Sequence, residues 1–233
     1  MKTQAIIPTA GMGTRFKADP PKPLVELSGK PICVYALETF ERCSLVDSVI
    51  LVGQKVRIPE LEGVVEKYGL KKVVKVITGG ETRQESVFNG LAAIDDDTDL
   101  VLVHDGVRPL VSLKVIEDVV GLCSKWDAVV TAVPVKSTIK KIHKKDLLVE
   151  KTLDREELWE VQTPQVFKKS VLLEAHQRNK SGHPTDDAMM VEQLGIKVKV
   201  SHGDYKNIKI TTQEDLAIAE TFLQLKGFSN EVL

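Results

Sequence analysis

The order of apolar segments along the chain constrains its fold more than any other feature of the sequence. Short β-branched runs that are apolar on both faces are typical of buried strands, and apolar residues spaced three or four apart are typical of amphipathic helices. The two kinds of segment alternate, which predicts right-handed β-α-β crossovers and an α/β fold with a mostly parallel sheet covered by helices on both faces. The predicted strands are Ala5–Pro8, Val49–Val52, Val73–Thr78, Leu100–His104 and Ala128–Val133, and the predicted helices are Ile32–Cys43, Pro59–Tyr68, Glu81–Ala93 and Leu113–Cys123.

Residues 136–160 break this alternation. Their loose polar and apolar alternation around the charged turn Lys144–Asp146 predicts a β-hairpin, too long and polar for a simple connection. It is either a solvated excursion or an arm that embraces a partner. The sequence has no internal repeat or linker, so we expect one domain over residues 1–233 with this hairpin as an arm. Beyond it we predict helices Lys168–Asn179, Asp186–Leu194 and Gln213–Leu225, and strands Lys197–His202 and Asn207–Ile210.

Composition narrows the possible partners. The 32 basic and 33 acidic side chains give a net charge of -1, which argues against binding to duplex nucleic acid. Three cysteines without C-x-x-C spacing, Cys33, Cys43 and Cys123, suit a reducing compartment. No apolar stretch approaches the roughly 20 residues of a membrane span, and the amino terminus lacks a signal-peptide pattern. We therefore expect a cytoplasmic protein without nucleic-acid or membrane partners.

A glycine-containing loop, Pro8–Phe16, follows the first predicted strand. Backbone amides in such a loop can close around phosphate oxygens, although a plain turn explains the glycines equally well. The loop is neither a Walker A motif nor a good dinucleotide fingerprint, since no acid follows the second strand; a nicotinamide dehydrogenase is therefore disfavoured. Two cations, Arg15 and Lys22, favour binding of a triphosphate and of the charge that develops when it is attacked. The alternative is a pair of solvated surface cations.

Two further segments contain residues suited to chemistry. Asp105 ends an apolar strand, where a carboxylate can hold Mg²⁺, and Arg108 either pairs with it or binds an anionic substrate. A structural Asp–Arg pair is the alternative, and His104 is interpreted as a packed strand-end residue. In Thr78–Ser86, backbone amides and the Ser86 hydroxyl can contact a base or a ribose, but a capped helix start explains the same residues. No cluster has zinc-site spacing.

Taken together, these segments resemble the 2-C-methyl-D-erythritol 4-phosphate cytidylyltransferase family. The resemblance covers nearly the whole chain. It rests on Ala-Gly-x-Gly-x-Arg with Pro-Lys22, Gly79-Gly80-x-x-Arg-x-x-Ser86, His104-Asp-x-x-Arg-Pro109, Pro134-x-x-x-Thr138, Asp154-Arg155, Gln162-Thr-Pro-Gln165, Thr185-Asp186 and Asn207-Ile-Lys209. Sugar-nucleotide pyrophosphorylases share the first loop, so that loop does not identify the nucleotide.

The resemblance implies a Rossmann-like fold, a homodimer made through the arm, and Mg²⁺-dependent transfer of CMP from CTP to 2-C-methyl-D-erythritol 4-phosphate. Arg15 and Lys22 match residues that stabilise the transition state, and Asp105 matches the metal-site acid. The positions that match the cytidine and phosphate pocket are Thr9, Ala10, Gly11, Gly13, Gly80 and Ser86. The positions that match the polyol phosphate site are Arg108, Thr138, Arg155, Thr185 and Lys209, with Arg155 supplied by the partner chain.

The implied mechanism needs no strong general base. A phosphate monoester is largely deprotonated at pH 7, so its oxygen can attack the α-phosphorus of CTP in line while pyrophosphate leaves. Catalysis then consists of alignment and charge neutralisation by Arg15, Lys22, Lys209 and Mg²⁺, with Arg155 on the acceptor. Two alternatives are a ribitol 5-phosphate cytidylyltransferase, with the same chemistry on another polyol, and a nucleotide-binding regulator without turnover.

Overall fold

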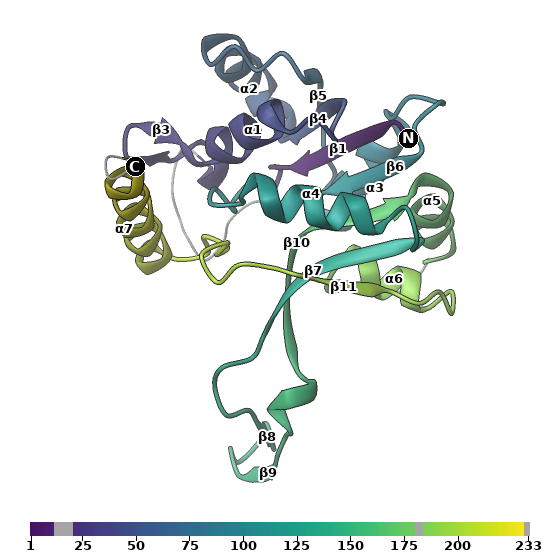
Figure 1. Ribbon diagram of the computed structural model, residues 1–233, viewed down its shortest axis with the longest axis vertical. Coiled ribbons are helices and arrows are strands. Elements are labelled where there is room, and N and C mark those ends of the chain that lie inside the picture. Colours follow the sequence, from purple (N-terminus) through teal and green to yellow (C-terminus); the bar gives the residue numbers. More distant parts are fainter. Residues whose placement is uncertain (12–20, 180–183, 231–233) are drawn as a thin grey trace.

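The computed structural model describes residues 1–11, 21–179 and 184–230, without the side chains of residues 226–230. Within these residues a seven-stranded sheet forms the centre of the molecule (Figure 1). Its strands are β1 (Thr3–Pro8), β4 (Ser48–Gly53), β5 (Val73–Thr78), β6 (Leu100–Val103), β7 (Ala128–Pro134), β10 (Trp159–Lys168) and β11 (Lys199–His202), in the order β11-β7-β10-β6-β1-β4-β5. The pairs β6–β1, β1–β4, β4–β5 and β7–β11 are parallel, whereas β10 is antiparallel to both β6 and β7.

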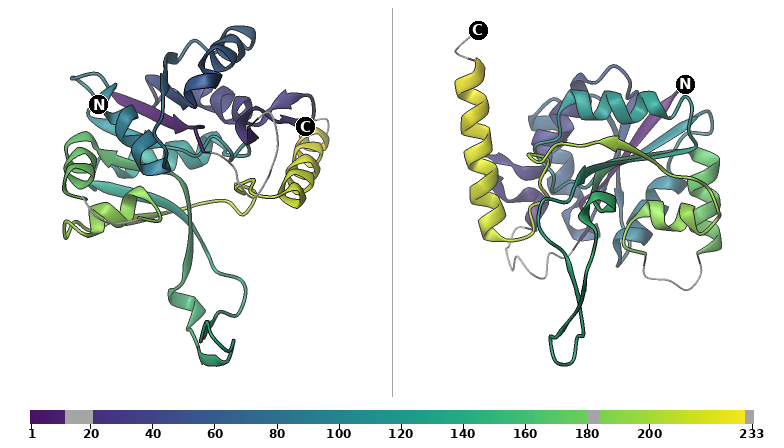
Figure 2. Two further views of the ribbon diagram at one scale, coloured as in Figure 1. Left: turned by 180° about the vertical axis from the view of Figure 1, so that it is seen from behind. Right: turned by 60° about the horizontal axis from the view of Figure 1, so that its bottom comes forward.

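Helices cover both faces of the sheet, as Figure 2 shows from two further sides. The α-helices are α1 (Ile32–Arg42), α2 (Ile58–Lys67), α3 (Arg83–Ala92), α4 (Leu113–Leu122), α5 (Lys169–Arg178), α6 (Asp187–Glu192) and α7 (Gln213–Asn230). Three short 3-10 helices are also present in the described residues: η1 (Lys22–Leu24), η2 (Lys55–Arg57) and η3 (Arg155–Glu157). In the described part of the chain, no helix has the length and apolar character needed to cross a membrane.

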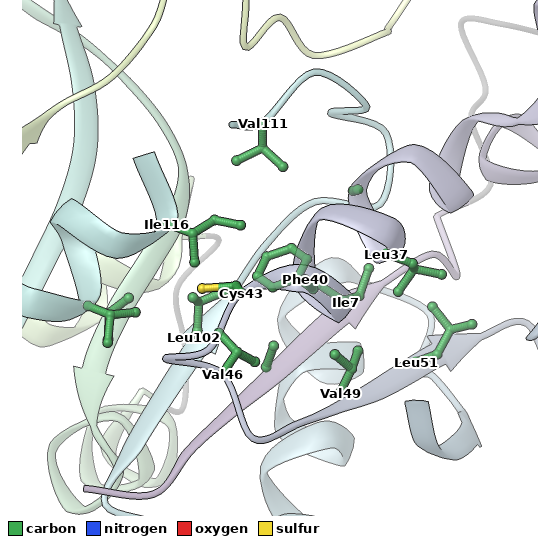
Figure 3. Close-up of a cluster of buried hydrophobic side chains, with 14 of the residues drawn as sticks. Ile7, Leu37, Phe40, Cys43, Val46, Val49, Leu51, Leu102, Val111 and Ile116 are labelled. Atoms are coloured by element: carbon green, nitrogen blue, oxygen red, sulfur yellow. The ribbon is translucent and has the colours of Figure 1, made fainter. Parts of the chain in front are cut away.

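Strand residues alternate between two apolar cores, one on each face of the sheet. Ile7 and Leu51 lie in the core under α1, α2 and α4, together with Phe40 of α1 (Figure 3). Their neighbours Ile6 and Ile50 lie in the opposite core, under α3, α5 and α6. This two-sided burial explains why the parallel strands are apolar at successive positions. The predicted α/β fold is confirmed.

The carboxyl-terminal helix α7 covers a third, smaller core. Leu27 and Ile32 contribute to this core from the start of the first crossover, and Ile210 and Ala219 from the chain's last segment. Leu27 lies in β2 (Glu26–Leu27), which pairs with β3 (Lys30–Pro31) in a small hairpin. The packing holds α7 against the first crossover.

Two features of the sheet differ from the sequence analysis. β10 was not predicted, although it lies in the middle of the sheet between β6 and β7. The strand predicted at Asn207–Ile210 is wrong: this segment joins no sheet, and its Ile210 amide donates to the Val107 carbonyl at 2.9 Å. The segment instead passes the ends of the strands and places its side chains there.

Residues 136–160 contain the small antiparallel pair β8 (Lys140–Ile142) and β9 (Val149–Thr152). This hairpin extends away from the sheet, below it in Figure 1, and its strand residues are exposed. The hairpin is joined to the sheet through β7 and β10, which are neighbours in the sheet. Near its base, the Tyr205 hydroxyl donates to the Pro134 carbonyl at 2.7 Å, and the Trp159 and His202 rings meet edge to face at 5.0 Å.

Candidate active site

The parallel strands β1, β4, β5 and β6 end at one edge of the sheet, where ligands bind in folds of this kind. Two cavities open there, and we name each after its most distinctive wall. The loop cavity, about 220 Å³, is lined by Pro8, Thr9, Gly11, Lys22, Pro23, Arg83, Ser86, Asp105, Val107 and Lys209. The β10 cavity, about 190 Å³, is lined by Arg83, Asp105, Arg108, Val161, Gln162, Thr163, Gln165, Thr185, Asp186 and Lys209. Arg83, Asp105 and Lys209 therefore line both cavities.

Asp105 is the centre of the charged residues between the cavities. Its Oδ1 accepts from Arg83 Nε at 2.8 Å, and its Oδ2 lies 2.7 Å from Lys209 Nζ and 3.9 Å from Arg108 Nε. Burial alone would raise the pKa of this carboxyl, but the charges of Arg83, Lys209 and Arg108 outweigh it and hold the pKa well below the usual range. The carboxylate is thus ionised and surrounded by cations.

A buried hydrogen-bond chain fixes the backbone at Asp105. Thr163 Oγ1 accepts from the Asp105 amide at 3.1 Å and lies 3.1 Å from Nδ1 of His104, whose Nε2 is 3.2 Å from the Arg108 carbonyl. Burial lowers the pKa of His104 to about 4, so its ring is neutral at pH 7. Thr163 can then donate to Nδ1 while Nε2–H donates to the carbonyl. His104 is a packed strand-end residue, in agreement with its interpretation from the sequence.

Arg108 is buried behind Asp105. Its Nη1 donates to the Asn207 carbonyl at 2.7 Å, while among the described residues its Nε has no hydrogen-bond partner. The side-chain Nδ2 of Asn207 in turn donates to the Thr163 carbonyl at 2.8 Å. A buried guanidinium with a spare donor at a cavity wall is suited to an anionic ligand.

The loop cavity lies where three backbone segments meet. A Cβ atom on Gly79 would lie 2.6 Å from Ser86 Oγ and 2.7 Å from Ala10 Cβ, so this close approach requires glycine. Ser86 Oγ accepts from the Gly80 amide at 3.2 Å and donates to the Thr82 carbonyl at 2.9 Å. The start of α3 also carries a capping box between Thr82 and Glu85. The capped helix start is therefore present, and Ser86 also lines the loop cavity.

Two other residues of the loop cavity have defined contacts. Thr9 donates through its amide and its hydroxyl to the Val52 carbonyl, at 2.7 and 2.8 Å. Its side chain therefore ties the first loop to β4. Lys22, in η1, reaches the Thr211 carbonyl at 3.3 Å and lines the cavity. The sequence candidates Gly13 and Arg15 lie outside the described residues.

Thr185 lines the β10 cavity, whereas two other candidates for the acceptor site lie apart from it. Thr138 and Arg155 belong to the segment of the exposed hairpin and line neither cavity. The Arg155 Nη1 donates instead to the Lys136 carbonyl at 2.9 Å. Within one chain the structure thus brings together Lys22, Asp105, Arg108 and Lys209 and leaves the hairpin residues outside.

The sequence analysis gave no role to Arg83, although it lines both cavities. Arg83 is the first residue of α3, where the positive end of the helix dipole disfavours a cation. A cation in that position needs an anionic partner. An arginine at the start of a predicted helix was therefore a sign in the sequence that a carboxylate lies beside it. Its second carboxylate partner, Asp187 at 2.7 Å from Nη1, lies on α6 and was also missed.

Asp105 is also the residue best placed for a metal ion. Among the described residues, no group of three or more His, Cys, Asp or Glu side chains is arranged to hold one. Mg²⁺ commonly uses one or two carboxylates together with substrate phosphates and water. The single ionised carboxylate of Asp105 at the wall of both cavities fits such a shared site and does not fit an all-protein cage.

Comparisons with known proteins agree on one family. The family model for 2-C-methyl-D-erythritol 4-phosphate cytidylyltransferase matches residues 3–225. A protein of that name from Alkaliphilus oremlandii is 42% identical over 228 residues, covering 97% of this chain and 96% of the relative. Another, from Geotalea uraniireducens, is 44% identical over 229 residues, covering 96% of this chain and 97% of the relative.

Solved structures give the same result. The 4-diphosphocytidyl-2C-methyl-D-erythritol synthase from Anaerococcus prevotii superposes with a TM-score of 0.84 at 36% identity, covering 96% of this chain and 98% of that one. A 2-C-methyl-D-erythritol 4-phosphate cytidylyltransferase from Thermus thermophilus superposes with a TM-score of 0.79 at 30% identity, covering 96% and 100%. The similarity thus extends over nearly the whole length in each case.

Proposed function

The chain belongs to the 2-C-methyl-D-erythritol 4-phosphate cytidylyltransferase family, and on that premise we propose that it transfers CMP from CTP to 2-C-methyl-D-erythritol 4-phosphate. The products are 4-diphosphocytidyl-2-C-methyl-D-erythritol and pyrophosphate, in the non-mevalonate synthesis of isoprenoids. An oxygen of the acceptor phosphate forms a bond to the α-phosphorus of CTP. The bond between that phosphorus and the bridging oxygen to the β-phosphorus breaks, and pyrophosphate leaves with its electrons.

One observation supports this assignment above the others: two cavities share a wall of three charged residues. A transferase must bring the transferred phosphoryl within reach of both substrates, so the reacting phosphorus belongs where the two cavities meet. CTP is assigned to the loop cavity, with its phosphates near Lys22, and the acceptor phosphate to the β10 cavity, near Arg108 and Thr185. Asp105 and Lys209 lie at the boundary between them.

The residues of the site supply positioning and charge rather than a strong base. Lys22 and Lys209, with Arg15 of the first loop, are assigned to the charge that builds on the transferring phosphoryl. Cytidine is assigned to the segments around Thr9–Gly13, Gly80 and Ser86, whose backbone amides can contact a base edge. Asp105 would hold Mg²⁺, which when bound neutralises phosphate charge and aligns the triphosphate.

The hairpin is assigned to dimerisation. Its surface carries exposed apolar side chains, Leu147 at 71% exposure and Leu148 at 65% among them, which are typical of a contact surface. Arg155 lines neither cavity of its own chain. A homodimer in which each hairpin contributes Thr138 and Arg155 to the partner's acceptor site explains both facts. The three cysteines, free and buried, are consistent with the cytoplasmic location that we propose.

Turnover with defined substrates tests this function. Pyrophosphate release should be measured with CTP and Mg²⁺ against 2-C-methyl-D-erythritol 4-phosphate and ribitol 5-phosphate, with chelator as a control. We expect release that depends on Mg²⁺ and is fastest with the methylerythritol substrate. A higher kcat/KM for ribitol 5-phosphate would transfer the assignment to that polyol, and binding of CTP without release would identify a regulator.

A further inference from the structure

Four side chains from four parts of the fold form a line that ends at Asp105. His176 of α5 lies 3.2 Å from Asp187 Oδ1, and Asp187 of α6 accepts from Arg83 Nη1 through Oδ2 at 2.7 Å. Arg83 of α3 donates from Nε to Asp105 Oδ1 at 2.8 Å. The line connects the helices behind the sheet with the boundary of the two cavities.

Asp187 is the unusual member of this line because its side chain is fully buried, at 0% exposure. It does not cap α6: the Asp186 side chain does so, by accepting from the Met189 amide at 2.9 Å. Burial alone would raise the pKa of Asp187, but the Arg83 charge and the His176 hydrogen bond outweigh it and lower that pKa, so the group is ionised. A buried ion pair is weak evidence for a contribution to stability. The role of the pair between Asp187 and Arg83 therefore needs another explanation.

The geometry of Arg83 indicates a role for this pair. Its guanidinium is held at Nε by Asp105 and at Nη1 by Asp187, so two of its edges are fixed. Among the described residues, Nη2 donates to no partner, and the side chain, 28% exposed, lines both cavities. A planar guanidinium held at two nitrogens presents its remaining N–H donors in fixed directions, as phosphate recognition requires.

We propose that Asp187, supported by His176, is a positioning residue that fixes Arg83 with its free edge toward the phosphoryl group in transfer. The inference rests on the proposed function, because it takes the boundary of the two cavities as the place of reaction. Without Asp187, the guanidinium remains bound to Asp105 alone and can rotate about that contact. Asp187 itself touches no substrate and acts through Arg83.

A double-mutant cycle tests the proposal. We expect Asp187→Asn to lower kcat about tenfold with KM for CTP changed less than about threefold, because the contact is strongest in the transition state. Arg83→Gln should lower kcat at least as much, and the double variant should be no worse than Arg83→Gln alone. Two results would overturn the proposal: a loss of kcat in the double variant equal to the product of the two single losses, or an unchanged kcat in Asp187→Asn.

A matched control separates positioning from folding. Ser112→Ala removes the hydroxyl that accepts a hydrogen bond from the Val115 amide at the start of α4, a helix on the opposite face of the sheet from α3, α5 and α6. It should lower the melting temperature and leave kcat per folded molecule unchanged, whereas Asp187→Asn lowers kcat at temperatures where it is fully folded. If Asp187→Asn does not fold, His176→Asn takes its place in the cycle with the same criterion.

Binding of inorganic pyrophosphate keeps this proposal distinct from the proposed function. In calorimetry, Asp187→Asn should weaken pyrophosphate binding about two- to threefold in the parent background, within the limit set for CTP, and leave it unchanged in the Arg83→Gln background. If the parent enzyme releases no pyrophosphate from CTP with either polyol phosphate, the proposed function fails while this coupling can still hold. Equal weakening in both backgrounds would overturn the positioning role whatever the reaction.

Discussion

Replacing Asp105 by asparagine removes a negative charge that lies close to three cations. Arg83 Nε at 2.8 Å, Lys209 Nζ at 2.7 Å and Arg108 Nε at 3.9 Å all lie near its carboxylate. The amide has the same size and lacks the charge, and its NH₂ group meets a donor on whichever side it faces. We therefore expect Asp105→Asn to destabilise the ligand-free protein as well as to abolish Mg²⁺-dependent turnover.

The expected size follows from burial. The Asp105 and Arg108 side chains are 8% and 9% exposed, and breaking such a buried pair costs about 3–5 kcal/mol. Lys209 is 40% exposed and can turn toward solvent, which favours the lower value. An unfolding entropy of about 2.1 cal/mol/K per residue over this chain gives roughly 0.5 kcal/mol per degree, so about 3 kcal/mol lowers Tm by about 6 °C.

Thermal unfolding of the ligand-free protein in a buffer without phosphate measures this effect. Asp118→Asn is the matched control: it makes the same change in an exposed pair with Lys114, and its Tm should stay close to the parent's. Pyrophosphate should raise the Tm of Asp105→Asn, because a bound anion replaces the missing charge. An Asp105→Asn variant as stable as the parent would refute the idea that this carboxylate offsets the repulsion among its cations.

Three further predictions follow from the site and the core. Lys22→Ala should lower kcat about a hundredfold while CTP binding changes little, and an unchanged kcat would remove Lys22 from the mechanism. Refolding Lys22→Ala with Arg155→Ala should restore roughly a quarter of parental activity, since about half the dimers are mixed and each has one intact site; no recovery with mixed dimers present would contradict a shared site. Burial raises the pKa of Cys33 to about 12, so its thiol stays protonated as pH rises to 8. A disulfide reagent at that pH should react with it only after unfolding in urea, and rapid reaction in the native protein would contradict its burial.

The central parallel strands β1, β4 and β6 could be predicted because both of their faces are buried. β6 is Leu-Val-Leu-Val with every residue buried, and such a run is visible in the sequence. β10 could not be predicted in this way, because its buried centre is polar: Gln165 reaches Asp186 at 2.8 Å, and Gln162 reaches the Asp204 carbonyl at 2.9 Å. These partners come from distant parts of the chain, so no local pattern shows that the polar groups are satisfied.

The residues of the candidate site also fall into two groups, those with a local signal in the sequence and those whose surroundings come from distant parts of the chain. Asp105 could be predicted from its place at the end of an apolar strand, and Lys22 from its place after the first loop. Asp187 could not, since its role depends on α6 packing beside α3 and α5. The segment around Lys209 was predicted as a strand, but it joins no sheet: Asn207 is buried behind the site, where it donates to the Thr163 carbonyl, and Ile210 packs in the third core.

The position of β10 has a consequence for the order in which the chain can be built. β6 and β7 are made first, but they are not neighbours in the folded sheet, because β10, which follows the hairpin, lies between them. A nascent chain that has emerged from the ribosome only as far as the hairpin therefore carries unpaired strand edges at the centre of its future sheet. The centre of the sheet is complete only when residues up to Lys168, the end of β10, have emerged. Until then, the unpaired edges favour association with other chains. The hairpin and β10 are thus the last residues that must leave the ribosome before β10 can join the two halves of the sheet.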